Sequence, residues 1–361
     1  MTASMSALID QPVRFDLAES TSPPLAVGAL IDVTELKDLG LGYGTSRGDD
    51  HVRTLIAAGA CVRPEQVLVT AGSIEAMFLV AQTVLRPGDR VLLTTPCFPP
   101  TRTVPEALGA VVDTVPLSFD DGYRLPLDRI AGALTPQTRL VSIASPQNPS
   151  GVRFTDAEVR GLVAAAQERA PDALILVDET YREATYGDCP VPASTASVSP
   201  QIVTCSSLSK AHGGPGLRVG WLTATDPDLY ERLRATKFHT AIACSTVDEV
   251  LAARLLERRA EILRPRAARL RAALDELTAW TRDRPISLVP PDGGALCCLR
   301  LPPAVPTAAF YARLAELDAR VAPGSWFGED DHVFRLGFGH LAPPDFTAAL
   351  DRLAAALAES T

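Results

Sequence analysis

The chain of 361 residues has few lysines and lacks any long apolar run. Only three of its 34 basic residues are lysines, Lys37, Lys210 and Lys237, so a reaction that needs a primary amine has three candidate side chains. No apolar stretch approaches the roughly 18 residues of a membrane-spanning helix, so we expect no membrane association. The amino terminus has no basic start and carries three acids among its first 20 residues, which is not typical of a signal peptide.

Charge and cysteine spacing exclude further classes of protein. The net charge is −9, with no basic tail or stripe, which argues against a dedicated nucleic-acid binder. The seven cysteines are odd in number and show no C-x-x-C spacing, whereas disulfide scaffolds and zinc modules need even, clustered sets. We therefore expect reduced thiols, no metal site and a cytoplasmic location, with Cys97, Cys297 and Cys298 in the core.

Between about residues 50 and 240, short apolar runs alternate with helical patterns. Helical spacing of apolar residues is found at 73–85 and 156–170. The strand-like runs lie at 67–70, 90–96, 110–117, 139–146, 174–179, 201–207 and 216–224. Several are almost continuously apolar, which is typical of strands covered on both faces. This order predicts an α/β fold with a mostly parallel sheet wrapped by helices.

The pattern changes after about residue 245. The Arg/Ala/Leu-rich stretch 247–277 predicts a long helix, with Pro265 as a break or kink. The runs that follow, to about residue 357, predict a small α+β domain. We expect three parts: an amino-terminal segment, 1–40, packed on the small domain; a large domain, 41–250; and the small carboxy-terminal domain, 251–361.

In an open α/β sheet, ligands bind outside the carboxyl ends of the strands. The first predicted strand is followed by Gly72 and Ser73 at a helix start, which is either an anion site or only a helix cap. Asn148 follows a later strand, in a loop that also reads as an ordinary Asn-Pro turn. Asp178 and Tyr181 follow the next strand, and a carboxylate at a buried strand end needs a cationic or N–H partner.

A further strand end carries hydroxyls and an amine. Ser207, Ser209 and Lys210 follow the run 201–207, and Arg218 comes eight residues after the lysine in a glycine-rich segment. Each feature is weak alone. Together they supply an amine, an acid with a phenol, an amide and an anion site, which is the set that pyridoxal phosphate requires.

The stretch from residue 43 to 335 resembles the class I/II pyridoxal-phosphate-dependent aminotransferases of fold type I. Two motifs carry the resemblance: S-L-S-K followed by G-L-R-V-G-W, and N-P-S-G followed 30 residues after its Asn by D-E-x-Y. The first is most similar to histidinol-phosphate aminotransferases. The resemblance covers nearly the whole chain and implies a three-layer αβα large domain with a small α+β carboxy-terminal domain.

The resemblance implies a role for each matching position around the cofactor ring. Lys210 would form the Schiff base with pyridoxal phosphate, and Asp178 would bind the ring nitrogen. Tyr181 and Asn148 would hydrogen-bond the phenolic oxygen. Phe98, in P-C-F-P-P, would stack on the ring, with a plain core role as the alternative. Lys210, Asp178 and Tyr181 would be the catalytic residues.

The resemblance also implies which residues bind the phosphate and the substrate. The phosphate would be held by Gly72, Ser73, Ser207, Ser209 and Arg218. Tyr43, in G-Y-G-T-S-R-G, is similar to the tyrosine that reaches the phosphate of a neighbouring subunit, which implies a homodimer with shared active sites. Arg335, in V-F-R-L-G-F-G, would bind the substrate α-carboxylate together with Asn148, with a structural role as the alternative.

The implied activity is transfer of an amino group between an amino acid and a 2-oxo acid through Lys210. The alternative is an enzyme with the same cofactor that eliminates, cyclises or oxidises an amino-acid side chain in specialised metabolism. A transcription regulator on this fold would need an added DNA-binding domain, and only about 40 residues precede the resemblance.

Three departures fall on positions outside the cofactor cradle. The segment LAESTSPPL, 17–25, lacks the Asn-Glu-Asn-Pro of histidinol-phosphate enzymes, so we do not expect that substrate. Thr180 stands where alanine or proline is common, and Asp248 where many relatives carry glutamine. His212, two residues after the lysine, is expected to pack or to face solvent.

Overall fold

The computed structural model describes residue 5 and residues 10–360. Residues 1–4 and 6–9, part of the predicted amino-terminal segment, lie outside the described residues, as does residue 361. A seven-stranded sheet forms the centre, in the order β2-β8-β7-β6-β5-β3-β4. Its strands are β2 (Val67–Thr70), β3 (Arg90–Thr95), β4 (Val111–Pro116), β5 (Thr138–Ala144), β6 (Leu174–Asp178), β7 (Ile202–Ser207) and β8 (Gly220–Ala224). Only β8 is antiparallel to its neighbours, so the predicted, mostly parallel α/β sheet is confirmed.

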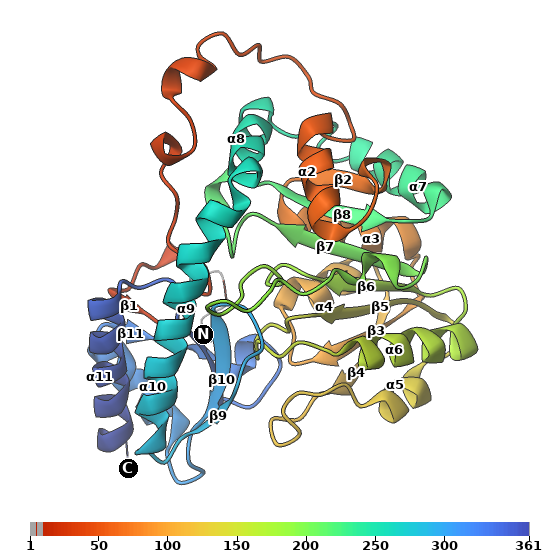
Figure 1. The fold of residues 1–361 in the computed structure, drawn as a ribbon. Coiled ribbons are helices and arrows are strands. Elements are labelled where there is room, and N and C mark those ends of the chain that lie inside the picture. The colour runs from red at the N-terminus through yellow and green to blue at the C-terminus, as the bar shows by residue number, and fades with distance from the viewer. Residues whose placement is uncertain (1–4, 6–9, 361) are drawn as a thin grey trace.

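Helices cover both faces of this sheet (Figure 1). They are α2 (Asp50–Ala60), α3 (Gly72–Val84), α4 (Pro99–Ala107), α5 (Leu127–Ala133), α6 (Asp156–Arg169), α7 (Pro227–Phe238) and α8 (Thr246–Glu257). Because side chains alternate along a strand, β3 sends Val91 and Leu93 into the core formed with α3 and α7. Leu92 points the other way, into the core formed with α5 and α6. This alternation explains why the strands read as continuous apolar runs in the sequence.

A second, smaller unit follows the large sheet. Its strands are β9 (Ser287–Val289), β10 (Leu296–Arg300), β12 (Ala322–Pro323) and β13 (Val333–Gly337), which form an antiparallel sheet in the order β12-β13-β10-β9. Three helices pack with it: α9 (Arg259–Arg282), α10 (Thr307–Glu316) and α11 (Pro343–Glu359). Within β13, Phe334 and Leu336 enter the core of this unit, and period-two alternation turns Arg335 toward the large sheet.

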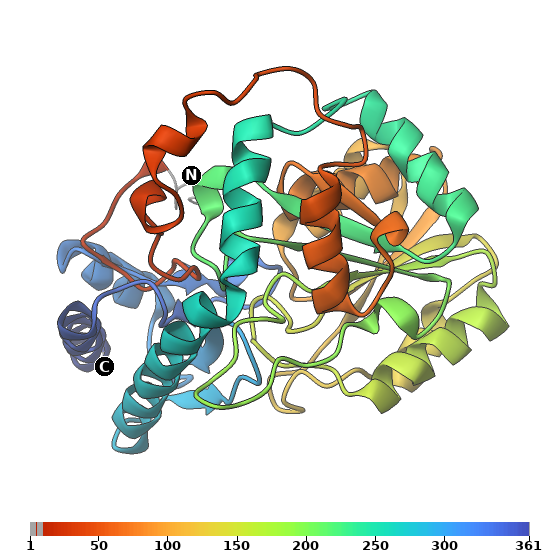
Figure 2. The same cartoon turned by 45° about the horizontal axis from the view of Figure 1, so that its top comes forward.

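The predicted break at Pro265 is wrong in position. The chain interrupts the helical stretch at Arg258, between α8 and α9, and Pro265 lies inside α9. The break falls there because the two halves pack on different partners. Leu255 of α8 packs with α2, whereas Leu270 of α9 belongs to the core of the smaller unit (Figures 1 and 2).

The amino-terminal segment crosses from one unit to the other. Strand β1 (Phe15–Asp16) pairs in parallel with β11 (Ala319–Arg320) of the smaller unit. The chain then runs over to α2, as Figure 2 shows in red. Short 3-10 turns lie at η1 (Val27–Ala29), η2 (Val33–Leu36), η3 (Pro64–Gln66), η4 (Thr195–Ser197), η5 (Pro215–Leu217) and η6 (Gly324–Trp326). The domain boundaries stay a prediction, and the one at residue 250 falls inside α8. Within residues 10–360, no helix is both long and apolar enough to cross a membrane.

Candidate active site

The strand register brings the predicted residues together at the carboxyl ends of the strands of the large sheet, which we call the carboxyl edge. Asp178, the last residue of β6, lies opposite Ala144 of β5 on one side and Cys205 of β7 on the other. Ser207 and Thr70 both lie opposite Gly220 of β8. The loops that carry the candidate side chains therefore start from neighbouring points of this edge, which is where an α/β sheet binds ligands.

The Lys210 amine lies in a half-open position among side chains from several segments. Its side chain is 26% exposed, and Nζ is 5.8 Å from the centre of the Tyr181 ring. Nζ also donates to Ser20 Oγ at 3.4 Å and is 3.7 Å from Glu19 Oε1. The Tyr181 hydroxyl hydrogen-bonds the same Ser20 Oγ at 2.8 Å. The structure thus brings together the predicted amine and the predicted phenol.

The other two lysines do not reach this place. Lys237 is fully buried, and its Nζ donates to the carbonyl oxygen of Ser46 at 2.9 Å. Lys37 is exposed and directly follows η2. Lys210 is therefore the lysine whose amine lies at the carboxyl edge of the sheet.

The Asp178 carboxyl group is buried, and its surroundings do not favour the ionised form. Its Oδ1 accepts a hydrogen bond from the Thr180 amide at 2.9 Å. Burial raises the pKa of the Asp178 carboxyl above its usual value, against the lowering effects of Thr180, Cys205 and Lys210. A protonated ring nitrogen beside Asp178 would stabilise the ionised form, so this residue fits the pyridine side of pyridoxal phosphate.

Gly72 opens a cradle at the start of α3. Its φ is +80°, and a Cβ there would lie 2.4 Å from Nη2 of Arg218. Ala71, the residue before the helix, makes no side-chain cap, so the first amides of α3, including that of Ser73, have no side-chain acceptor from the N-cap. Free amides at a helix start attract anions.

Arg218 completes the cradle. Its backbone adopts the left-handed conformation, with φ of +50°, directly after η5. Nη1 of Arg218 donates to Ser209 Oγ at 3.4 Å and to the carbonyl of Pro215 at 2.9 Å, while the Ser209 amide donates to Ser207 Oγ at 3.4 Å. The guanidinium, two hydroxyls and the start of α3 therefore fit a phosphate dianion.

The phosphate-binding role of Gly72 can be tested by substitution. Gly72→Ala is expected to weaken pyridoxal phosphate binding about tenfold or more, because left-handed backbone at a non-glycine residue costs about 1–2 kcal/mol and the new Cβ displaces Arg218. Titration of the cofactor-free protein with pyridoxal phosphate measures the affinity. Gly132→Ala in α5 is the matched control, since a Cβ there meets nothing within 4 Å. Equal affinities of Gly72→Ala and the wild type would place the phosphate elsewhere.

Arg335 joins the two sheets and keeps unused bonding capacity. It is 2% exposed, donates through Nη1 to Asn148 Oδ1 at 2.9 Å and through Nη2 to the Ala18 carbonyl at 2.6 Å. Its Nε is buried without a hydrogen-bond partner among the described residues. The ring of Phe327 lies 4.8 Å from the guanidinium carbon. A buried guanidinium with a free N–H suits a carboxylate ligand that binds through two parallel hydrogen bonds.

Phe98 and Tyr43 differ in their surroundings. Phe98 precedes α4 and, with Asn148, lines a small cavity at the carboxyl ends of β3 and β5. Tyr43 is 89% exposed. The segment of Tyr43 is held from behind, since Thr246 Oγ1 donates to the Gly42 carbonyl at 3.1 Å and Lys237 holds Ser46. Tyr43 is therefore an exposed side chain on a segment that hydrogen bonds hold in place.

Glu19 and Ser20, which both contact Lys210, are not among the site residues predicted from the sequence. The sequence marks their segment, 17–25, only by its departure from the histidinol-phosphate pattern. No strand end or motif marks them, since the hydrogen bonds that hold them come from residues more than 150 positions away. The absence of Asn-Glu-Asn-Pro from segment 17–25 is the feature of the sequence that could have drawn attention to them.

His212 belongs to a buried charge network around Glu183 and does not face solvent. His212 Nε2 lies 3.1 Å from Glu183 Oε2, and the Arg259 and Arg182 guanidinium groups each lie 3.4 Å from the same carboxylate. Burial by itself would raise the pKa of Glu183, but His212, Arg259 and Arg182 outweigh it and lower the pKa to about 2. Cys297 and Cys298 are fully buried, as expected, and Cys97 is partly buried.

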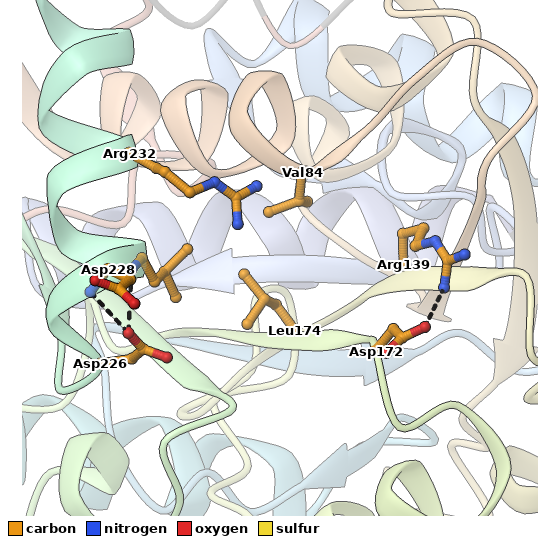
Figure 3. Close-up of a pocket in the computed structure, with 8 residues that line it drawn as sticks. Val84, Arg139, Asp172, Leu174, Asp226, Asp228 and Arg232 are labelled. Carbon is orange, nitrogen blue, oxygen red and sulfur yellow. Dashed lines mark hydrogen bonds and ion pairs between the residues drawn. The ribbon is translucent and has the colours of Figure 1, made fainter.

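A separate pocket lies at the opposite ends of the parallel strands, beside the first residues of β5 and β6 (Figure 3). Its charged side chains already serve the fold. Arg139 pairs with Asp172 at 3.2 Å, and Asp226 accepts from the amides of Asp228 and Leu229 at the start of α7. This pocket therefore does not compete with the Lys210 edge as the reaction site.

The family model "Aminotransferase class I and II" matches residues 15–353. The chain belongs to this family. Capreomycidine synthase of Streptomyces vinaceus is 30% identical over 338 residues, which cover 92% of this chain and 84% of the relative. Arginine–pyruvate transaminase of Pseudomonas aeruginosa is 35% identical over 187 residues, about half of each chain. A pyridoxal-phosphate-dependent aminotransferase of Streptococcus suis superposes with a TM-score of 0.89 at 26% identity, covering 97% of this chain and 94% of that one.

These matches confirm the predicted class I/II aminotransferase family, its fold type I architecture and the prediction of an enzyme of this family. The roles of the individual residues stay predictions. The geometry brings most of them together, with Tyr43 as the outward-facing exception.

Proposed function

We propose that this aminotransferase-family protein binds pyridoxal 5'-phosphate at the Lys210 edge and exchanges an amino group between an amino acid and a 2-oxo acid. The observation that carries the proposal is the place of the Lys210 amine, beside Tyr181 and near a buried arginine with a free N–H. The name of one relative, arginine–pyruvate transaminase, gives a substrate pair of the same kind.

The side chains divide the chemical work. When bound, pyridoxal phosphate supplies an aldehyde that condenses with amines and a ring that withdraws electrons from the substrate α-carbon. Asp178 would keep the ring nitrogen protonated, and Tyr181 would hydrogen-bond the phenolic oxygen. Lys210 would hold the cofactor through its side-chain amine, and the same amine, when free, would act as the base and acid that moves the proton of the substrate α-carbon. Arg335 orients the α-carboxylate.

We propose that the enzyme is a homodimer with shared active sites. Tyr43 and Leu41 are strongly exposed for large hydrophobic side chains, at 89% and 82%, on the segment that Lys237 and Thr246 hold. This exposure supports the role of Tyr43 as a ligand of the partner's phosphate. The seven unpaired cysteines support the prediction of a cytoplasmic location.

Arg335→Ala is expected to raise the KM of amino donor and oxo-acid acceptor alike by about 10- to 100-fold, because hydrogen bonds to charged groups contribute about 1.5–3 kcal/mol. Arg335→Lys keeps the charge but loses the forked geometry, so its KM values should lie between those of Ala and wild type. Steady-state kinetics in both directions measure these constants. Unchanged KM values for both substrates in Arg335→Ala would exclude the carboxylate role.

The decisive test of the reaction type is a single half-reaction. The loaded enzyme is mixed with an amino acid and no acceptor, and the product is separated and identified. Stoichiometric pyridoxamine phosphate and 2-oxo acid support transamination. Consumption of the amino acid without pyridoxamine phosphate would instead favour a cyclase or another reaction with the same cofactor. One relative, capreomycidine synthase, is named as a synthase and not as an aminotransferase.

A further inference from the structure

The segment 17–25, which we call the strap, is held between the two units of the chain. Toward the smaller unit, the Gly337 amide donates to the Leu17 carbonyl at 2.6 Å, and Arg335 holds the carbonyl of Ala18. Toward the large unit, the Ser22 amide donates to the Lys210 carbonyl at 3.2 Å. The strap therefore has a fixed course across the Lys210 edge.

More contacts fix its far end. The Leu25 amide donates to the Gly213 carbonyl at 2.9 Å, and Arg266 of α9 donates to the Pro23 carbonyl at 2.9 Å. A Cβ on Gly213 would lie 2.3 Å from that Pro23 carbonyl, which shows how closely the strap lies on the loop after Lys210. A side chain that the strap presents to the site is thus presented in one position.

Glu19 is the side chain that the strap presents. From Leu17 to Ser22 every residue is buried except Glu19, whose side chain is 24% exposed. Its Oε1 lies 3.7 Å from Lys210 Nζ and accepts from the Ser20 amide at 2.8 Å. Burial by itself would raise the pKa of Glu19, but Lys210, Arg335, the Ser20 amide and His340 outweigh it and lower the pKa. A negative charge is therefore fixed at the site.

The positively charged groups near Glu19 belong to Lys210, Arg335 and His340, and the first two have other partners during the reaction. If the proposed function holds, on which this inference rests, Lys210 acts on the bound substrate as an uncharged amine base, and Arg335 binds the substrate α-carboxylate. His340 hydrogen-bonds Thr21 through Nδ1 at 3.4 Å. With substrate bound, the Glu19 carboxylate is then left without a full cationic partner, in a partly buried place where an unpaired charge is unfavourable.

We propose that Glu19 binds the cationic group of the substrate side chain, and that the enzyme selects amino acids bearing a side-chain ammonium or guanidinium group. A cation supplies the counter-charge that the bound state lacks. An acidic side chain would be repelled by Glu19, and a neutral one would leave the carboxylate unpaired. Glu19 is thus a specificity determinant of the Lys210 site.

The test compares donors that differ in charge at nearly equal size. L-arginine is paired with L-citrulline, and L-lysine with L-norleucine, in the first half-reaction of the loaded wild-type enzyme and of Glu19→Gln. We expect the wild type to prefer the charged member of at least one pair, in kcat/KM, by about 10- to 100-fold. Which pair shows the preference tells a guanidinium from an ammonium site. The exposed Glu65, on η3, provides the matched control variant Glu65→Gln, which should keep the wild-type ratio.

Glu19→Gln should lower that ratio by about tenfold or more, since it keeps the shape and removes the charge. The inhibition constant of the 2-hydroxy acid analogue of arginine, which has no amino group to transfer, measures binding without turnover and should rise in parallel. A wild-type ratio near one for both pairs would overturn the proposal. So would an equal loss for charged and neutral donors in Glu19→Gln, which would mean that Glu19 acts on Lys210. Pyridoxamine phosphate formed from a neutral donor would leave the proposed function standing in either case.

Discussion

Lys210→Ala is expected to lower transamination by about 10⁴-fold or more, because general acid–base catalysis alone contributes about 10²–10⁴-fold and this residue also carries the cofactor. The structure supports a single amine in this role, since Lys237 is buried against the Ser46 carbonyl. Half-reaction rates with a saturating amino donor measure the loss. The protein should still fold, because the Lys210 side chain is partly exposed and contacts only the side chains of Glu19 and Ser20 and the face of the Tyr181 ring among the contacts described above.

Lys37→Ala is the matched control for this prediction. Lys37 is exposed after η2, and its replacement should leave the half-reaction rate unchanged. Addition of a small primary amine should restore part of the activity of Lys210→Ala if the missing group is the base. Turnover of Lys210→Ala near the wild-type rate would show that another group performs the proton transfer.

Asp178→Asn is expected to slow the chemical step by about 10²–10³-fold, the usual effect of removing one electrostatic group from a reacting centre. Asparagine keeps the shape but cannot keep a proton on the ring nitrogen through its charge. Single-turnover kinetics isolate this step from substrate binding. A rate within a few-fold of wild type would mean that Asp178 does not contact the ring.

The stability of the cofactor-free protein should respond in the opposite sense. Burial raises the pKa of the Asp178 carboxyl, so its ionised form destabilises the fold at neutral pH. That destabilisation is absent below the unfolded-state pKa and grows as the pH rises through the raised folded-state value. Asp178→Asn should therefore unfold at an equal or higher urea concentration than wild type at pH 7. A clear loss of stability at that pH would contradict this assignment.

The sequence predicted the large sheet well because its strands carry their own signal. Buried parallel strands such as 174–178 are apolar on both faces, and the polar residues at their ends mark where the sheet stops. The motif around Lys210 then identified the chemistry. Asp178 and Lys210 could be placed together because parallel strands share one edge, which is a property of the fold rather than of either residue.

Features that depend on tertiary contacts could not be predicted in this way. The helix break lies at Arg258 because α8 and α9 pack on different units, and local propensity pointed to Pro265. Glu19 lies at Lys210 because the strap is bonded to both units, and nothing in its local sequence requires that course. His212 is buried because Glu183 and Arg259 surround it, and these residues are far apart in the chain.

Borohydride reduction followed by peptide mass mapping shows which lysine carries the cofactor. The protein is reconstituted with pyridoxal phosphate, reduced, digested and searched for a lysine that carries the reduced cofactor. We expect one modified peptide, containing Lys210, and none in the Lys210→Ala protein. A label on Lys37 or Lys237, or a protein that remains colourless and unlabelled after reconstitution, would contradict it.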